Sequence, residues 1–236
     1  NRLAREIAEL CKAGGFEPTI HPDVHAAVGA SPSLIVETSA RGDEKREILS
    51  RLDAQSPSAV ILTSCLGYST TRIASWIVKP ERLVGFATFY PLEQKKVIEL
   101  GGGLKTQEGP LREAETFFGA LGKESVRVKD IPGLIFPRIL SLIINEASRS
   151  LDEGVAEAEE IDVAMRLGVN YPSGPLRWAD QIGLDEIIAV LEGLQGETGD
   201  DRYRPAPLLK KIVGAGFLGE TTRRGFYAYH EGQVKP

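Results

Sequence analysis

Short apolar runs alternate with stretches of helical periodicity over the first 130 residues, and this alternation most restricts how the chain can fold. The clearest runs are SLIVE at 33–37, AVILT at 59–63 and LVGFA at 83–87. A short, continuous apolar run is typical of a strand buried on both faces of a parallel sheet. Strands separated by helices therefore predict an α/β domain with a parallel sheet and right-handed crossovers.

The remaining elements of this half follow from spacing and from glycine and proline. Residues 2–12 have apolar side chains at helical spacing, and Gly14 and Gly15 end that helix. Residues 16–20 are predicted to form a short strand, which Pro18 restricts to an edge of the sheet. The glycine run at 101–103 is predicted to be a turn. Further predicted elements are a helix around 48–52, helices at 69–78 and 109–121, and strands at 97–100 and 125–128.

The pattern changes after residue 130. From about residue 134 onward apolar side chains recur at helical spacing, and strand patterns nearly vanish. We therefore predict an α/β domain at 1–130 and an all-α domain at 131–236.

Composition and charge argue against nucleic acid, a membrane or a metal ion as a partner of this chain. The net charge is −5 and the charges are mixed along the chain, so nothing indicates a nucleic-acid-binding surface. No apolar stretch is long enough to span a membrane, and no secretion signal is visible. Cys11 and Cys65 are far apart and lack metal-ligand spacing, so we expect free thiols, no metal site and a cytoplasmic protein.

The helical half contains long and specific motifs. Residues 144–178 read INEASRSLDEGVAEAEEIDVAMRLGVNYPSGPLRW, and RYRPAPLL at 202–209 and GFY at 225–227 follow. This half resembles the C-terminal domain of NAD-dependent 3-hydroxyacyl-CoA dehydrogenases, the 3-hydroxybutyryl-CoA dehydrogenase family. The order and spacing of the first half also resemble that family, so the similarity covers nearly the whole chain.

The resemblance implies an architecture and a cofactor. Residues 1–130 would form a Rossmann-type NAD-binding domain, whose first strand and Gly-rich loop are expected upstream of Asn1. Residues 131–236 would form the helical domain that contributes to the substrate site and makes a homodimer. The family uses NAD in fatty acid metabolism, where it oxidises a 3-hydroxyacyl-CoA to a 3-ketoacyl-CoA.

The resemblance also implies which positions would do the chemistry. In the family a histidine removes the hydroxyl proton, a glutamate partners that histidine, and a serine and an asparagine hold the substrate oxygen. Glu99 falls on the glutamate. The histidine position, within GFATFYP at 85–91, holds Ala87, the serine position holds Leu66, and the asparagine position holds Pro137.

Three residues are candidates for the cofactor by the same resemblance. Asp23 lies one residue after the position of the acid that binds ribose, Lys45 matches a family lysine, and Ser64 replaces an asparagine. None of the histidines, which are His21, His25 and His230, aligns with the point of hydride transfer.

These residues leave three hypotheses open. The first is an oxidoreductase that transfers hydride between NAD and a 3-hydroxyacyl-CoA. The second is a pseudoenzyme, a non-catalytic homologue that binds a nucleotide or acyl-CoA or serves as a dimeric structural partner. The third is hydride transfer on a different substrate, with Glu99 as the base.

Overall fold

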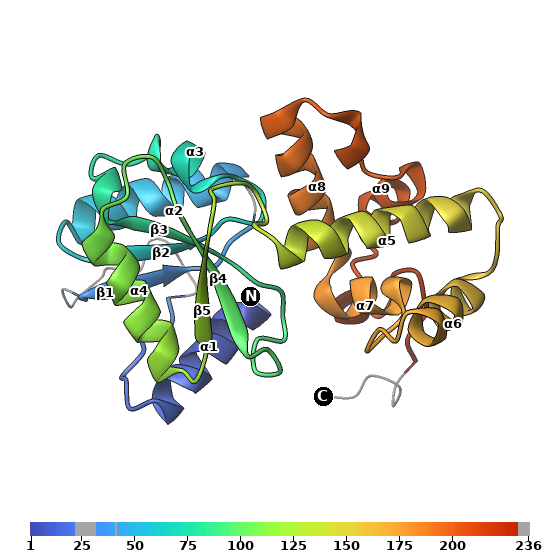
Figure 1. Cartoon of the computed structure of the whole chain (residues 1–236), viewed down its shortest axis with the longest axis horizontal. Helices are drawn as coiled ribbons and strands as arrows, with labels where there is room; N and C mark the ends of the chain where they lie inside the picture. Colours follow the sequence, from blue (N-terminus) through green and yellow to red (C-terminus); the bar gives the residue numbers. More distant parts are fainter. Residues whose placement is uncertain (22–31, 41, 231–236) are drawn as a thin grey trace. The chain divides into compact units, whose positions relative to one another are not determined.

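The computed structural model describes residues 1–21, 32–40 and 42–230 (Figure 1). The chain divides into two compact units, Asn1–Phe136 and Pro137–Pro236. The division lies six residues beyond the predicted boundary, because Ile135 and Phe136 are hydrogen-bonded to Glu99 of the first unit. The predicted combination of a Rossmann-type sheet domain followed by a helical domain is confirmed.

The first unit is built on a five-stranded sheet in the order β1-β2-β3-β4-β5. Three neighbouring pairs are parallel, but β3 and β4 are antiparallel. The connection between these two strands, residues 88–96, contains no helix. Parallel neighbours need a longer crossover, so the prediction of a wholly parallel sheet is wrong at this pair. The strands are β1 (Leu34–Glu37), β2 (Val60–Ser64), β3 (Leu83–Ala87), β4 (Val97–Gly102) and β5 (Glu124–Val128).

In the described part of this unit, four helices accompany the sheet: α1 (Arg2–Ala13), α2 (Gly42–Gln55), α3 (Thr70–Ala74) and α4 (Glu108–Ala120). A 3-10 turn at Pro80–Arg82 precedes β3. An apolar core joins α1 and α4 to β2, β3 and β4, with Ile7, Phe86 and Phe118 among its buried side chains. It forms because each helix presents a row of apolar side chains to the strands.

Two further predictions for this unit are wrong. Residues 16–20 have no strand structure, although Phe16 packs against Phe117 with ring centroids 5.7 Å apart. No described strand pairs with them, and Pro18 has no N–H to donate to a ladder. Gly101 and Gly102 belong to β4 and not to a turn. A Cβ on Gly101 would lie 2.9 Å from Leu134 Cδ2, so glycine there permits close packing.

The second unit is helical, as predicted. Its helices are α5 (Phe136–Asp152), α6 (Ala158–Gly168), α7 (Pro175–Ile182), α8 (Leu184–Thr198) and α9 (Pro207–Gly214), with 3-10 turns at Asp201–Tyr203 and Glu220–Thr222. Phe136, the first residue of α5, still belongs to the first unit. Among the described residues, no helix has both the length and the apolar character needed to cross a membrane.

Buried carboxylates organise the helical unit. Asp162 accepts hydrogen bonds from the backbone N–H groups of Leu176 and Arg177 (2.8 and 2.9 Å), which open α7. Asp180 accepts from Phe226 N and Tyr227 N, both at 2.9 Å. These contacts satisfy backbone donors that would otherwise be buried without partners, so each carboxylate joins segments that are distant in the sequence.

Candidate active site

The carboxyl ends of β1, β2 and β3 lie at the same edge of the sheet because these three strands are parallel. The start of α1 lies at this edge too, since Asn1 Nδ2 donates to Thr38 O (2.8 Å), directly after β1. Asn1 Oδ1 caps the helix by accepting from Ala4 N (2.9 Å). The first turn of α1 has no acidic residue and contains Arg2 and Arg5. A helix N-terminus beside parallel strand ends suits the phosphates of a dinucleotide, so these residues fit NAD.

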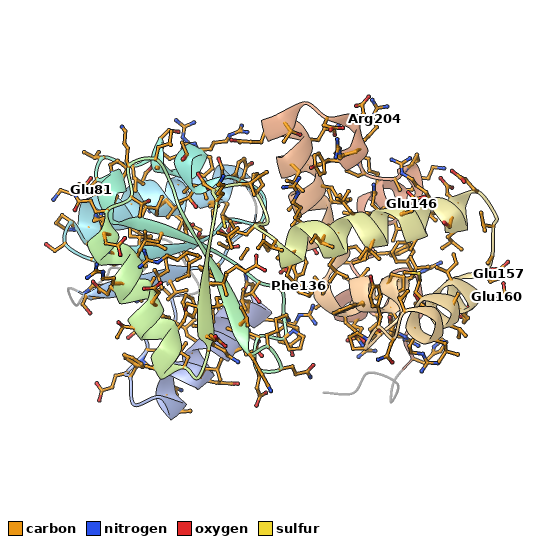
Figure 2. All side chains as sticks on the ribbon, viewed as in Figure 1. Glu81, Phe136, Glu146, Glu157, Glu160 and Arg204 are labelled. Carbon is orange, nitrogen blue, oxygen red and sulfur yellow. The ribbon has the colours of Figure 1, made fainter. Side chains whose placement is uncertain are left out.

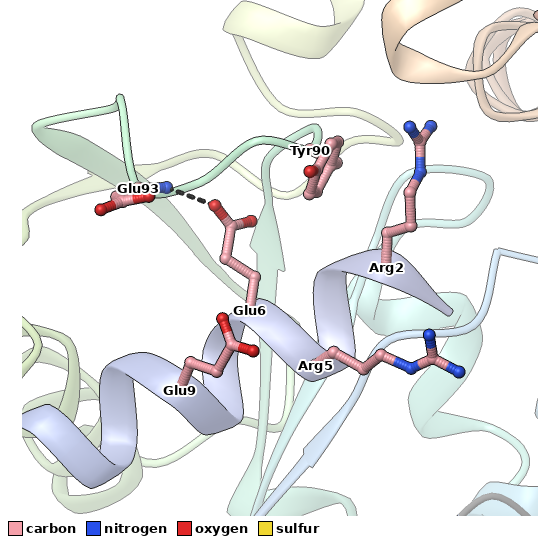
Figure 3. Close-up of a pocket in the computed structure, with 6 residues that line it drawn as sticks. All are labelled: Arg2, Arg5, Glu6, Glu9, Tyr90 and Glu93. Atoms are coloured by element: carbon pink, nitrogen blue, oxygen red, sulfur yellow. Dashed lines mark hydrogen bonds between the residues drawn. The ribbon is translucent and has the colours of Figure 1, made fainter. Parts of the chain in front are cut away.

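The outer side of α1 borders a hollow of about 230 Å³. Figure 3 shows its lining, which comes from α1 and from the segment after β3. The Arg2 guanidinium lies over the Tyr90 ring, 4.4 Å from the ring centroid, and this cation–π contact ties the start of α1 to that segment. Sequence reasoning missed the contact, because a pairing between residues so far apart leaves no local pattern. The lining residues are Arg2, Arg5, Glu6, Glu9, Tyr90 and Glu93.

Ala87 and Glu99, which the resemblance assigns to the family's histidine and glutamate positions, lie directly opposite each other in the antiparallel pair of β3 and β4. Opposed residues in such a pair have Cβ atoms about 4.5–5.5 Å apart and side chains on the same face. Ala87 is 3% exposed and Glu99 is 9% exposed. The sheet therefore brings together the two positions that the resemblance paired, but a methyl group occupies one of them.

The carboxylate of Glu99 is held by the start of α5. Its Oε2 accepts from Ile135 N (2.6 Å), and its Oε1 accepts from Phe136 N (2.9 Å); Phe136 is labelled in Figure 2. Burial raises the pKa of Glu99, and the two backbone N–H groups oppose that rise. Gly133 and Leu134 turn the chain toward this carboxylate through left-handed conformations, with φ of 70° and 46°.

The residues that the resemblance assigns to the family's serine and asparagine positions are also apolar and buried. Leu66, at the serine position, is 2% exposed and offers no hydrogen-bonding side chain. Pro137 is the second residue of α5, where its missing N–H has no intrahelical acceptor, so the helix accommodates it. Neither residue can hold a substrate oxygen through its side chain.

Neither Cys65 nor Thr88, two described polar side chains near Ala87, is a ready proton acceptor. Cys65 Sγ donates to Phe86 O (3.2 Å), and burial raises the pKa of this thiol, so it stays protonated. Thr88 Oγ1 is buried near its neighbour's carbonyl, 3.3 Å from Phe89 O. In the described part of the chain the histidines are His21 and His230; both are exposed, and neither belongs to the β3–β4 pair.

The predicted cofactor residues have different environments. Lys45 is almost fully buried, pairs with Glu37 at the end of β1, and donates to Ser39 O (2.9 Å). The Lys45 ammonium therefore holds the end of β1. Ser64 is buried at the end of β2, and Asp23 lies outside the described residues. Sequence reasoning missed the role of Glu37, although an acid that closes an apolar strand is a visible signal.

Comparison with known proteins agrees with both units. Residues 17–131 match the 3-hydroxyacyl-CoA dehydrogenase, NAD binding domain, and residues 133–229 match the 3-hydroxyacyl-CoA dehydrogenase, C-terminal domain. The fold and the edge of its sheet are those of an NAD-binding oxidoreductase with a helical second domain. More specifically, the chain belongs to the 3-hydroxyacyl-CoA dehydrogenase family.

Relatives with curated names support this membership. The chain is 41% identical over 232 residues to a probable 3-hydroxybutyryl-CoA dehydrogenase of Bacillus subtilis, covering 98% of this chain and 79% of the relative. It is 39% identical over 209 residues to the 3-hydroxybutyryl-CoA dehydrogenase of Bradyrhizobium diazoefficiens, covering 88% and 71%.

Solved structures agree as well. The (S)-3-hydroxybutyryl-CoA dehydrogenase PaaH1 of Ralstonia eutropha has a TM-score of 0.74 and 38% identity, covering 84% of this chain and 71% of that one. FadB2 of M. tuberculosis has a TM-score of 0.78 and 29% identity, covering 98% and 85%.

Proposed function

We propose that this chain has the NAD-dependent 3-hydroxyacyl-CoA dehydrogenase framework of its family, and that residue 87 limits its hydride transfer by supplying no general base. The observation that carries the proposal is the pairing of Ala87 with Glu99. Oxidation of a hydroxyl requires loss of the O–H proton as the C–H hydride leaves, and a methyl group cannot accept a proton.

NAD, when bound, accepts the hydride. The start of α1 would face its phosphates through backbone N–H groups and the positive charges of Arg2 and Arg5. Lys45 would act by holding the end of β1 through Glu37, and Ser64 by lining the end of β2. Asp23 remains the proposed ribose ligand.

A non-catalytic role in binding a nucleotide or an acyl-CoA is the second candidate. One observation favours it: both oxygens of Glu99 already accept backbone hydrogen bonds, as those of a structural carboxylate do. The buried and apolar Leu66 points to the same role.

We also propose that the chain forms a homodimer through its helical unit and acts in cytoplasmic fatty acid metabolism. Val163 and Leu167 are one helical turn apart on α6, and both are exposed, as is Val169 just beyond it. Contact with a second copy would remove these apolar side chains from water. Sedimentation of the protein beside Leu167→Glu tests this, and a monomeric parent protein would contradict it.

The decisive experiment is NADH consumption with acetoacetyl-CoA by the protein beside Ala87→His. In this reducing direction the base of the oxidation acts as the acid that protonates the forming alkoxide. Positioned acid–base catalysis contributes roughly 100-fold or more in rate, so we expect that gain in Ala87→His. Ala87→Asn is the matched control, because it adds a polar side chain of comparable reach without a basic nitrogen. Rapid turnover by the unmodified protein would contradict the proposal.

Failure of both proteins to turn over would favour the binding role. Calorimetric titration with NAD and with acetoacetyl-CoA then decides whether the binding framework is retained.

A further inference from the structure

The connection between β3 and β4, residues 88–96, is held from one side by a buried lysine. Lys123 lies between α4 and β5 and is 7% exposed. Its Nζ donates to Leu92 O (2.9 Å), Glu93 O (3.1 Å) and Lys95 O (2.7 Å). An ammonium has three N–H donors, so these carbonyls use its full capacity.

A carboxylate holds the same residues through their N–H groups. Glu6, on α1, accepts from Leu92 N and Glu93 N, both at 2.7 Å; Figure 3 shows its bond to Glu93. The peptide group between Leu92 and Glu93 thus has its carbonyl on the ammonium of Lys123 and its N–H on the carboxylate of Glu6. Hydrogen bonds to charged groups are roughly twice as strong as neutral ones, so this arrangement restrains the peptide from both sides.

The connection is also restrained near β3. Lys95 Nζ donates to Phe89 O (2.7 Å) and Pro91 O (2.5 Å). The Phe89 ring packs against that of Phe136 with centroids 6.3 Å apart. Lys123 thus holds the backbone of Lys95 through its carbonyl, and the side chain of Lys95 in turn holds the carbonyls of Phe89 and Pro91.

We propose that Lys123 is a positioning residue, whose ammonium fixes the β3–β4 connection and thereby orients residues 87–90 at the carboxyl edge of the sheet. Three converging carbonyls form a cation-binding cradle that this side chain fills. Its effect on turnover rests on the proposed function, but its effect on the loop does not.

Amide hydrogen exchange of residues 88–96 tests the restraint. In Lys123→Ala we expect the amides of 92–95 to exchange at least about tenfold faster, because the loss of even one of the three hydrogen bonds from the ammonium corresponds to about that factor. Lys96→Met is the matched control, because Lys96 is an exposed lysine in the same connection. The amides of 92–95 should exchange in Lys96→Met as they do in the parent protein.

Chemical rescue separates positioning from general stabilisation. Propylammonium replaces the removed amine and stem, so it should restore slow exchange in Lys123→Ala, whereas tetramethylammonium, which has no N–H donor, should not. Unchanged exchange, equal acceleration throughout the chain, or equal action of the two ions would overturn the proposal.

Turnover is measured in the Ala87→His background. Adding Lys123→Ala should lower kcat about tenfold, with KM for acetoacetyl-CoA changed less than twofold, and propylammonium should recover kcat. A rise in KM with kcat unchanged would overturn the proposal that Lys123 is a positioning residue. If Ala87→His itself is inactive, the proposed function fails while the exchange measurement still decides the restraint.

Lys123→Met covers the case in which Lys123→Ala does not fold, because it keeps an apolar stem and removes only the ammonium. The three carbonyls lose the same donors, so the same amides should exchange faster. Unchanged protection in Lys123→Met would overturn the proposal.

Discussion

Glu99 in the sheet unit and Asp180 in the helical unit are both buried carboxylates that accept from two successive backbone N–H groups. Their side-chain partners differ. Asp180 also accepts from the Tyr229 hydroxyl (2.9 Å), and the Arg177 guanidinium lies 5.3 Å from the centroid of the Tyr229 ring. Glu99 lies opposite Ala87.

The comparison shows that a carboxylate proposed for function and a structural one can share the same local contacts. Backbone N–H groups satisfy both oxygens of Glu99, so the fold does not need a histidine at residue 87. An alanine at residue 87 is therefore compatible with the sheet, whereas loss of a partner of Asp180 would disturb the packing of the helical unit.

The largest expected effect is on the helical unit. In Asp180→Asn the amide NH₂ would face a backbone N–H, so one buried donor loses its acceptor. We expect a loss of about 3 kcal/mol in the free energy of unfolding, because the carboxylate is fully buried and accepts three hydrogen bonds. Urea denaturation measures it.

Asp152→Asn is the control, because Asp152 is exposed at the end of α5 and its change should stay within about 0.5 kcal/mol. If Asp180→Asn and the parent protein had equal free energies of unfolding, Asp180 would not be a structural carboxylate of the helical unit.

A smaller loss in the free energy of unfolding is expected for Glu99→Gln. The substitution leaves one of the two backbone N–H donors without an acceptor, and Glu99 has no tyrosine partner to lose. We expect a loss of about 2 kcal/mol by the same denaturation. In the Ala87→His background it should also lower turnover, because the imidazole would lose its negatively charged partner. An unchanged rate there would assign Glu99 to structure alone.

The sequence predicted most elements of the fold because apolar runs and helical periodicity are local signals. The runs at 83–87 and 33–37 became β3 and, but for one residue, β1. The predictions of a strand at residues 16–20 and of a turn at Gly101 were wrong. Strand formation depends on which neighbouring strands pair and pack, and tertiary contacts decide this.

The candidate site was predictable only residue by residue. Glu99 and Ala87 were identified, but their opposition depends on the antiparallel register of β3 and β4. The contacts of Glu99 and Lys123 are to backbone groups, which every residue carries, so no sequence pattern marks them. Lys45 was assigned to the cofactor because it matches a family lysine, and its burial against Glu37 is visible only in the folded chain.

Gly101→Ala should cost less than either carboxylate change. Its new Cβ would lie 2.9 Å from Leu134 Cδ2, at the end of a side chain that can shift, so we expect a loss of about 1 kcal/mol. Gly119→Ala in α4 is the matched control: a Cβ there meets nothing within 4 Å, and alanine should add about 0.5 kcal/mol. Thermal denaturation compares them, and a stabilised Gly101→Ala would show that the close packing is not needed.

The smallest expected effect is the pH dependence that the two carboxylates share. Burial raises the pKa of both above the ordinary values of 3.8 for Asp180 and 4.5 for Glu99. The folded state then binds these protons more tightly than the unfolded state, so their stabilising contribution is complete below those values and is lost as pH rises through the folded pKa. The stability difference between the parent protein and Asp180→Asn should therefore shrink as pH rises from about 3.8, and that for Glu99→Gln from about 4.5. Urea denaturation across pH 3–8 measures both, and a difference that grows with pH would show that hydrogen bonding outweighs burial at that carboxylate.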